Sequence, residues 1–237
     1  DSLRIDGFMP SFTFINVSPD GNYFSYYLKG NFVAHKTSDF SMVSKFDVPF
    51  LTYGNMELYS SAISDNQILL VVDTYSTLKM INFLTGEEIF RKLSNESGSM
   101  RGAKINGSGD RILTQVLKDS KLYLSLNSFE NETWEELGKT DAIPYSRKWY
   151  YGFGEGVVYI VREFKLRQYK AEVRRSEDFS LLYEMVFPND FQPVVNDCRG
   201  MKLVLKYRYS SGPDYGYLAD IANGTLTKTI PVIGNPG

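Results

Sequence analysis

The sequence predicts an all-β protein built from about five repeated units, and three observations lead to that prediction. Aromatic residues make up 15% of the 237 residues, with 17 Tyr and 16 Phe, and aromatic side chains favour strands. The apolar runs are as short as strands, as in Ile68–Val72, and none approaches the about 20 residues of a membrane helix. Turn-forming residues recur in front of these runs at a nearly constant spacing. A fold of repeated β-units accounts for all three observations.

The recurring turn lies at equivalent positions along the whole chain. These positions are Asp20, Asp65, Gly109, Glu155 and Arg199, which lie 45, 44, 46 and 44 residues apart. The alternative is a β-sandwich with accidental spacing, which has turn signals about every 8–12 residues and no longer period. The constant spacing favours repeats over a sandwich.

Each unit reads as four short strands separated by turns rich in Asp, Asn and Gly. In the first unit the expected strands are Phe12–Val17, Tyr23–Leu28, Asn31–Lys36 and Met42–Val48. Four strands in a repeat of about 40–45 residues are typical of a blade of a β-propeller. The sequence therefore predicts a single β-propeller domain over 1–237 with four-stranded antiparallel blades. The expected repeats are 9–50, 51–94, 95–140, 141–187 and 188–232.

The number of blades in the ring is left open between two alternatives. Five repeats fit a closed five-bladed ring or part of a six- or seven-bladed one, since propellers have about 4–8 blades. Leu3–Phe8 also reads as a strand, which would belong to a further blade or cover an open edge.

Two segments resemble known propeller repeats. Val17–Phe24, with the sequence VSPDGNYF, and Ile81–Ile89, with the sequence INFLTGEEI, are similar to the degenerate repeats of TolB-like and YVTN-type propellers. The Gly-His and Trp-Asp dipeptides of tryptophan–aspartate repeats are missing. The resemblance implies the fold over nearly the whole chain, but not the activity, because propellers serve in binding, scaffolding and catalysis.

The loops between the fourth and first strands, and between the second and third, are expected to gather on one face of a propeller, which we call the loop face. They carry aromatic and cationic residues, the types enriched at interface hot spots. We expect a protein or glycan ligand to bind there. The predicted binding residues are Tyr53, Arg101, Arg147, Lys148, Trp149, Phe191 and Tyr215.

Catalysis is disfavoured by the residues of the expected channel strands. These strands hold no Asp or Glu, and only Glu57 and Asp190 stand at their entrances, whereas glycosidases need paired carboxylates. The single His35 falls within an expected strand, so it reads as a strand-face residue. We therefore predict no catalytic residue, no metal and no cofactor. The alternatives are a hydrolase- or lactonase-type enzyme using Glu57 and Asp190, or a structural subunit assembled through an open blade edge.

The net charge and the short sequence motifs indicate which partners and which compartment to expect. Arg162–Arg175 is the most basic stretch, but the net charge of −2 argues against nucleic acid, and the stretch reads as a solvated outer face of the fourth blade. No transmembrane segment is expected. The chain opens without signal-peptide features, and sequons occur at Asn16, Asn95, Asn106, Asn131 and Asn223. We expect a mature secreted or periplasmic protein from which a targeting peptide has been removed.

Overall fold

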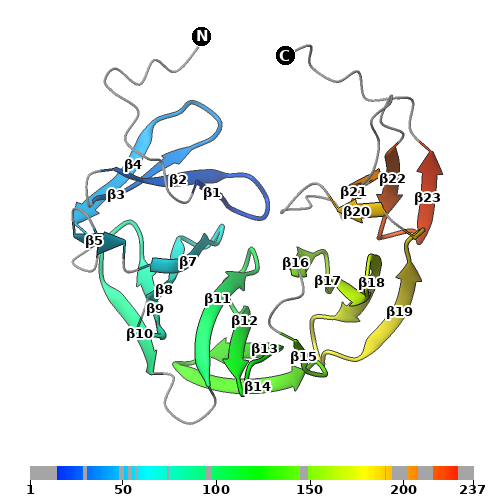
Figure 1. Ribbon diagram of the computed structural model, residues 1–237. Coiled ribbons are helices and arrows are strands. Elements are labelled where there is room, and N and C mark those ends of the chain that lie inside the picture. Colours follow the sequence, from blue (N-terminus) through cyan, green and yellow to red (C-terminus); the bar gives the residue numbers. More distant parts are fainter. Residues whose placement is uncertain are drawn as a thin grey trace. The chain divides into compact units, whose positions relative to one another are not determined.

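The computed structural model describes most of the chain, and all of its described elements are β-strands (Figure 1). The described residues are 15–28, 31–47, 51–52, 55–56, 58–73, 75–93, 98–144, 149–189, 191–193, 202–207 and 216–228. The expected strand Leu3–Phe8 lies outside them.

Each of the five predicted repeats forms one sheet in which consecutive strands are neighbours. The first blade consists of β1 (Asn16–Val17), β2 (Tyr23–Leu28), β3 (Asn31–Lys36) and β4 (Met42–Asp47). The second consists of β7 (Leu58–Ile63), β8 (Ile68–Asp73), β9 (Thr77–Asn82) and β10 (Glu88–Leu93). The third consists of β11 (Ser99–Ile105), β12 (Arg111–Lys118), β13 (Lys121–Glu130) and β14 (Thr133–Lys139). The fourth consists of β16 (Trp149–Gly154), β17 (Val157–Lys165), β18 (Gln168–Arg175) and β19 (Leu181–Val186). The fifth consists of β20 (Phe191–Pro193), β21 (Lys202–Tyr207), β22 (Gly216–Asp220) and β23 (Thr225–Lys228).

The predicted fold class is confirmed by these sheets, whose described registers are antiparallel. Three short strands were not predicted. β5 (Leu51–Thr52) pairs with β6 (Asn55–Met56) in a small hairpin. β15 (Ile143–Pro144) pairs with β13 beyond the end of β14.

The chain divides into two compact units. The first comprises 1–116 and 129–133, and the second comprises 117–128 and 134–237. The single-domain organisation expected from the sequence stays a prediction.

The core of the first unit lies between the first and second blades. Tyr27 and Phe32 from the first blade pack with Leu69, Val71 and Phe83 from the second. The rings of Phe32 and Phe83 have centroids 6.0 Å apart. The many aromatic residues of the chain thus serve here to fill the space between neighbouring sheets.

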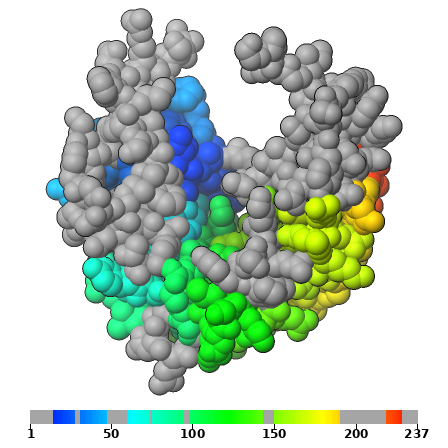
Figure 2. All heavy atoms as spheres, viewed as in Figure 1, coloured from blue at the N-terminus to red at the C-terminus, as the bar shows by residue number. Residues whose placement is uncertain are grey.

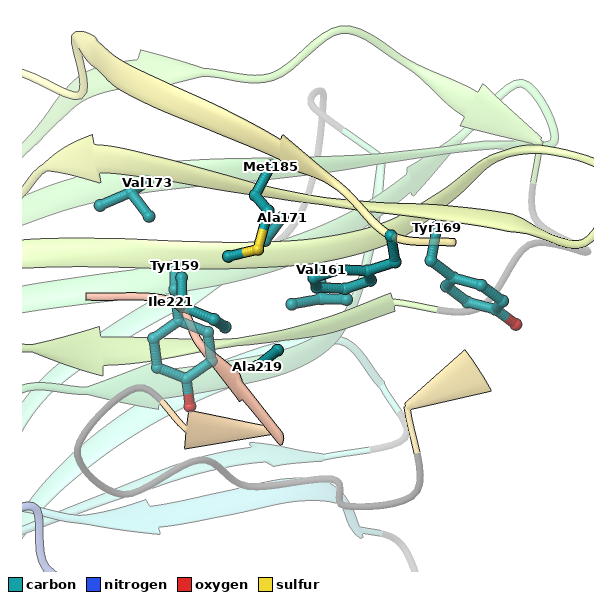
Figure 3. Packing of buried hydrophobic residues seen from close by; sticks show 9 residues of the cluster. Tyr159, Val161, Tyr169, Ala171, Val173, Met185, Ala219 and Ile221 are labelled. Atoms are coloured by element: carbon teal, nitrogen blue, oxygen red, sulfur yellow. The ribbon is translucent and has the colours of Figure 1, made fainter. Parts of the chain in front are cut away.

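The core of the second unit lies between the fourth and fifth blades (Figure 3). Tyr159 and Val161 of β17 pack with Ala171 of β18, and Ile221 after β22 joins the same cluster. Alternate residues of a strand point to opposite faces of its sheet. Ile160 and Arg162 of β17 therefore belong to the other face of the fourth blade.

Candidate functional site

Most of the predicted binding residues lie outside the described part of the structure. These are Tyr53, Arg147, Lys148 and Tyr215, together with the side chains of Trp149 in β16 and Phe191 in β20. Arg101 alone is described with its side chain, half-buried in β11. Glu57 and Asp190, on which the enzyme alternative depends, are also outside. The grouping of these residues on one face stays a prediction.

Two loops between second and third strands are described in full and a third in part, and two of these three expose large side chains. Tyr75, between β8 and β9, has 73% of its surface exposed, and Leu166, between β17 and β18, has 77% exposed. The remaining loop, Asp119–Ser120, turns through two residues with positive φ, as a tight hairpin requires.

The hairpin between β17 and β18 ends in a hydrogen-bonded tip. We call Phe164, Lys165, Leu166 and Arg167 the blade-four loop tip. Arg167 has a φ of 63°, a conformation that costs a side-chain-bearing residue free energy. Its backbone N–H donates to Glu163 Oε1 at 2.7 Å. This hydrogen bond stabilises the turn and fixes where the exposed Leu166 is presented.

Cations surround the aromatic ring of this tip. Lys165 Nζ lies 5.7 Å from the centroid of the Phe164 ring, and Lys170 Nζ lies 5.9 Å from it. Both distances are within the range of cation–π attraction. Lys170 stands directly opposite Arg162 in the pairing of β17 with β18. The positive charge therefore continues from the tip along one face of the sheet.

The connection from the fourth to the fifth blade lies against the same end of the sheet. Gln168 Nε2 donates to Asn189 Oδ1 at 2.9 Å, and the backbone N–H of Phe187 donates to Tyr169 O at 2.9 Å. Both kinds of loop expected on the loop face are thus neighbours in this blade. Figure 2 shows atoms of the fourth blade, coloured lime to yellow, at the molecular surface.

A buried ion network occupies the middle of the basic stretch. Glu172 is fully buried, with 0% of its surface exposed. It accepts hydrogen bonds from Arg162 Nε at 2.6 Å and from Arg174 Nη2 at 2.9 Å, and Lys170 Nζ lies 3.0 Å from its Oε1. The prediction that Arg162–Arg175 is a solvated outer face is wrong for these residues, because the cations turn inward to pair with a carboxylate.

Close packing against a neighbouring strand explains the burial of this face. The Arg174 guanidinium stacks on the Phe179 ring at 4.9 Å, and Phe179 approaches Gly138 of β14. A Cβ placed on Gly138 would lie 2.7 Å from Phe179 Cβ. Any larger residue at position 138 would therefore displace the aromatic side chain that covers Arg174.

The electrostatics of Glu172 follow from this packing. Burial acts to raise its pKa, but the hydrogen bond from Arg174 and the charges of Arg162 and Lys170 outweigh burial. The pKa of Glu172 therefore lies below its ordinary value, and the side chain is a carboxylate at neutral pH.

His35 has a structural role in the first blade. Its Nδ1 lies 2.9 Å from the carbonyl oxygen of Phe40, which only accepts, so Nδ1 carries the proton. Its Nε2 accepts from Tyr26 Oη at 3.2 Å, and its ring stacks on Phe24 with centroids 5.0 Å apart. The position of His35 in β3 agrees with the strand-face interpretation.

The described residues contain neither a candidate metal-binding cluster nor a membrane-spanning helix. No group of three or more His, Cys, Asp or Glu side chains in this part of the chain could hold a metal ion. No helix among these residues has the length and apolar character needed to cross a bilayer.

Comparisons with known proteins address the fold. No family model matches the chain, and no curated protein matches it. Among solved structures, the chain is similar to Kluyveromyces lactis Hsv2, with a TM-score of 0.61, 12% identity, and coverage of 92% of this chain and 63% of that one. It is similar to Kuenenia stuttgartiensis hydrazine synthase, with a TM-score of 0.58, 11% identity, and coverage of 92% and 65%.

A third likeness is to the WD40 domain of Toxoplasma gondii coronin, with a TM-score of 0.56, 14% identity, and coverage of 90% of this chain and 56% of that one. This chain spans less than two thirds of each of these three proteins. At such low sequence identity, the similarity to these structures indicates only the fold. Together with the repeated four-stranded sheets, they show that the chain has a β-propeller fold.

Proposed function

We propose that the protein is a non-catalytic β-propeller interaction module that binds a protein or glycan on its loop face. The observation that carries this proposal is the blade-four loop tip, which presents the exposed Leu166 beside the cations around Phe164. A surface that combines apolar and cationic groups on a hydrogen-bonded turn suits recognition of a partner. The likeness to propellers of the WD40 type supports an interaction role.

The proposal assigns the predicted residues to one binding face. Arg101, Arg147, Lys148 and Trp149 are the preferred contacts, and Tyr53, Phe191 and Tyr215 extend the face. A TolB-like or YVTN-type origin and a secreted or periplasmic location belong to this proposal, as does assembly with another chain through an open blade edge.

A double substitution tests the proposal. Arg147→Ala with Trp149→Ala should abolish capture of the partner from an extract of the source organism, and purified partner should then fail to bind. The thermal melting temperature should stay unchanged, because the two residues are assigned to contact with a ligand. Lys36→Ala with Phe40→Ala is the matched control, because it removes a cation and an exposed aromatic side chain beside the β3–β4 turn. Equal capture by both double variants would contradict the proposal.

A further inference from the structure

We infer that the blade-four loop tip recognises an acidic peptide segment of the partner that carries an apolar side chain. This inference rests on the proposed function and adds the chemistry of the partner. It is based on the juxtaposition of an exposed leucine with the exposed cations Lys165 and Arg167 on a hydrogen-bonded turn.

The apolar half of the site is Leu166. With 77% of its surface exposed, it stands at the end of a turn that Glu163 fixes through the backbone N–H of Arg167. Covering a leucine with another apolar side chain is favourable, and a turn whose backbone is already hydrogen-bonded loses little backbone freedom on binding. An aliphatic or aromatic residue of a partner is the group that gains from this contact.

The charged half of the site is the cationic side of the tip. Lys165 and Arg167 are exposed there against one carboxylate, Glu163. Behind them, Lys170 pairs with Glu172 and Glu184, so its charge is already matched within the blade. A carboxylate approaching Lys165 beside Leu166 therefore meets favourable potential.

A peptide fits this surface better than a nucleic acid does. Single-stranded nucleic acids are bound through aromatic faces on which the bases stack. The Phe164 ring is half-buried with Lys165 and Lys170 close to it, and the most exposed side chain is aliphatic.

Fluorescence anisotropy with defined probes tests the inference. The probes are a labelled dodecapeptide of four Glu-Glu-Leu repeats, its Glu-Glu-Ser counterpart, a Lys-Lys-Leu counterpart and an oligothymidine of the same length. The full chain should bind the Glu-Glu-Leu peptide more tightly than the other three, and binding should weaken as salt screens the charges. Equal or tighter binding of the Glu-Glu-Ser peptide, the Lys-Lys-Leu peptide or the oligothymidine would overturn the inference.

Variants then locate the binding. Lys165→Gln and Leu166→Ser should each raise the Kd of the Glu-Glu-Leu peptide about 3–10-fold. The matched controls are Arg175→Gln, which removes one exposed positive charge at the far end of β18, and Leu182→Ser, which removes an exposed leucine from β19. Each control should leave the Kd within about 2-fold of wild type. Equal effects of a variant and its control would show that the loop tip is not the site.

The outcome is distinguishable from failure of the proposed function. If Lys165→Gln and Leu166→Ser leave capture of the natural partner intact while Arg147→Ala with Trp149→Ala abolishes it, the loop face binds a partner and this inference is wrong. If neither set affects capture, the proposed function fails as well.

Discussion

Glu172 holds three cations on one face of a β-sheet. Its partners approach from β17 and β18 because Arg162 stands opposite Lys170, and residues 170, 172 and 174 alternate to the same face. A buried ion pair contributes little net stability compared with apolar packing, but removing one partner leaves uncompensated charge. The network is therefore a point at which a single substitution has a large effect.

Glu172→Gln should lower the free energy of unfolding by about 3 kcal/mol, because Arg162 and Arg174 would lose their counter-charge while staying largely buried. Urea unfolding at neutral pH measures this loss. Glu184→Gln is the control, since this carboxylate pairs with Lys170 but its side chain is 39% exposed, and its loss should cost less than about 1 kcal/mol. Similar losses for the two variants would show that Glu172 is not held as described.

Acid should remove the contribution of Glu172. Burial raises its pKa, but the hydrogen bond from Arg174 and the nearby charges lower it further, to below the ordinary value. In the unfolded chain Glu titrates near about 4.3, so between the two values the unfolded state binds more protons. The free energy of unfolding should fall as the pH drops below about 4.3.

Urea unfolding of wild type and Glu172→Gln over a pH series tests the direction of this pH dependence. The difference in stability between the two proteins should narrow as the pH falls from about 7 to about 3. A difference that stays constant across this range would mean that the Glu172 carboxylate is not selectively stabilised by folding.

At the scale of elements, the turns between first and second strands connect neighbouring blades. Ser18 Oγ donates to Asp65 Oδ1 at 2.6 Å, and the backbone N–H of Asp20 donates to Asp65 Oδ2 at 2.9 Å. The backbone N–H of Asp65 in turn donates to Gly107 O at 3.0 Å. The turns whose spacing revealed the repeats thus bond to one another across the first three blades.

Asp65→Ala should lower the free energy of unfolding by about 2 kcal/mol, because it removes two hydrogen bonds to a charged acceptor. Asp39→Ala is the control, since Asp39 bonds only within its own turn, to Ser41 at 3.0 Å and 2.7 Å, and should cost about half as much. Urea unfolding gives the two values, and hydrogen exchange should show faster opening of β1 and β2 in Asp65→Ala alone. Unchanged exchange there would contradict the connecting role of Asp65.

At the scale of the whole molecule, the sequence predicts the fold better than the site. The bounds of β2 and β3 coincide with the predicted strands, because apolar alternation and turn residues are local signals in the sequence. β5, β6 and β15 contain two residues each, which is too short for any periodic pattern. Propeller folds serve many activities, so the fold does not by itself identify the ligand.

The basic stretch Arg162–Arg175 shows why the burial of charged residues could not be predicted from the sequence. Charged residues usually lie in water, and from sequence alone Arg162–Arg175 looks exposed. A signal was nonetheless present, because Lys170, Glu172 and Arg174 alternate in sign along one face of a strand. The β17–β18 hairpin and its bulge determine which residues of β17 stand opposite these three side chains. The sequence alone did not predict that register. The exposed Leu166 at the hairpin tip was missed for the same reason.

The hydrogen bonds between the turns that join first and second strands also restrict how the chain can gain or lose repeats. Two hydrogen bonds join the first turn to the second across 45 and 47 residues, so a deletion within the first repeat would separate both donors from their acceptor, Asp65. Removal of an entire repeat would instead place the equivalent turns of the two flanking repeats next to each other. Length changes that preserve folding are therefore expected in whole repeats, or in the loops at the opposite end of each blade.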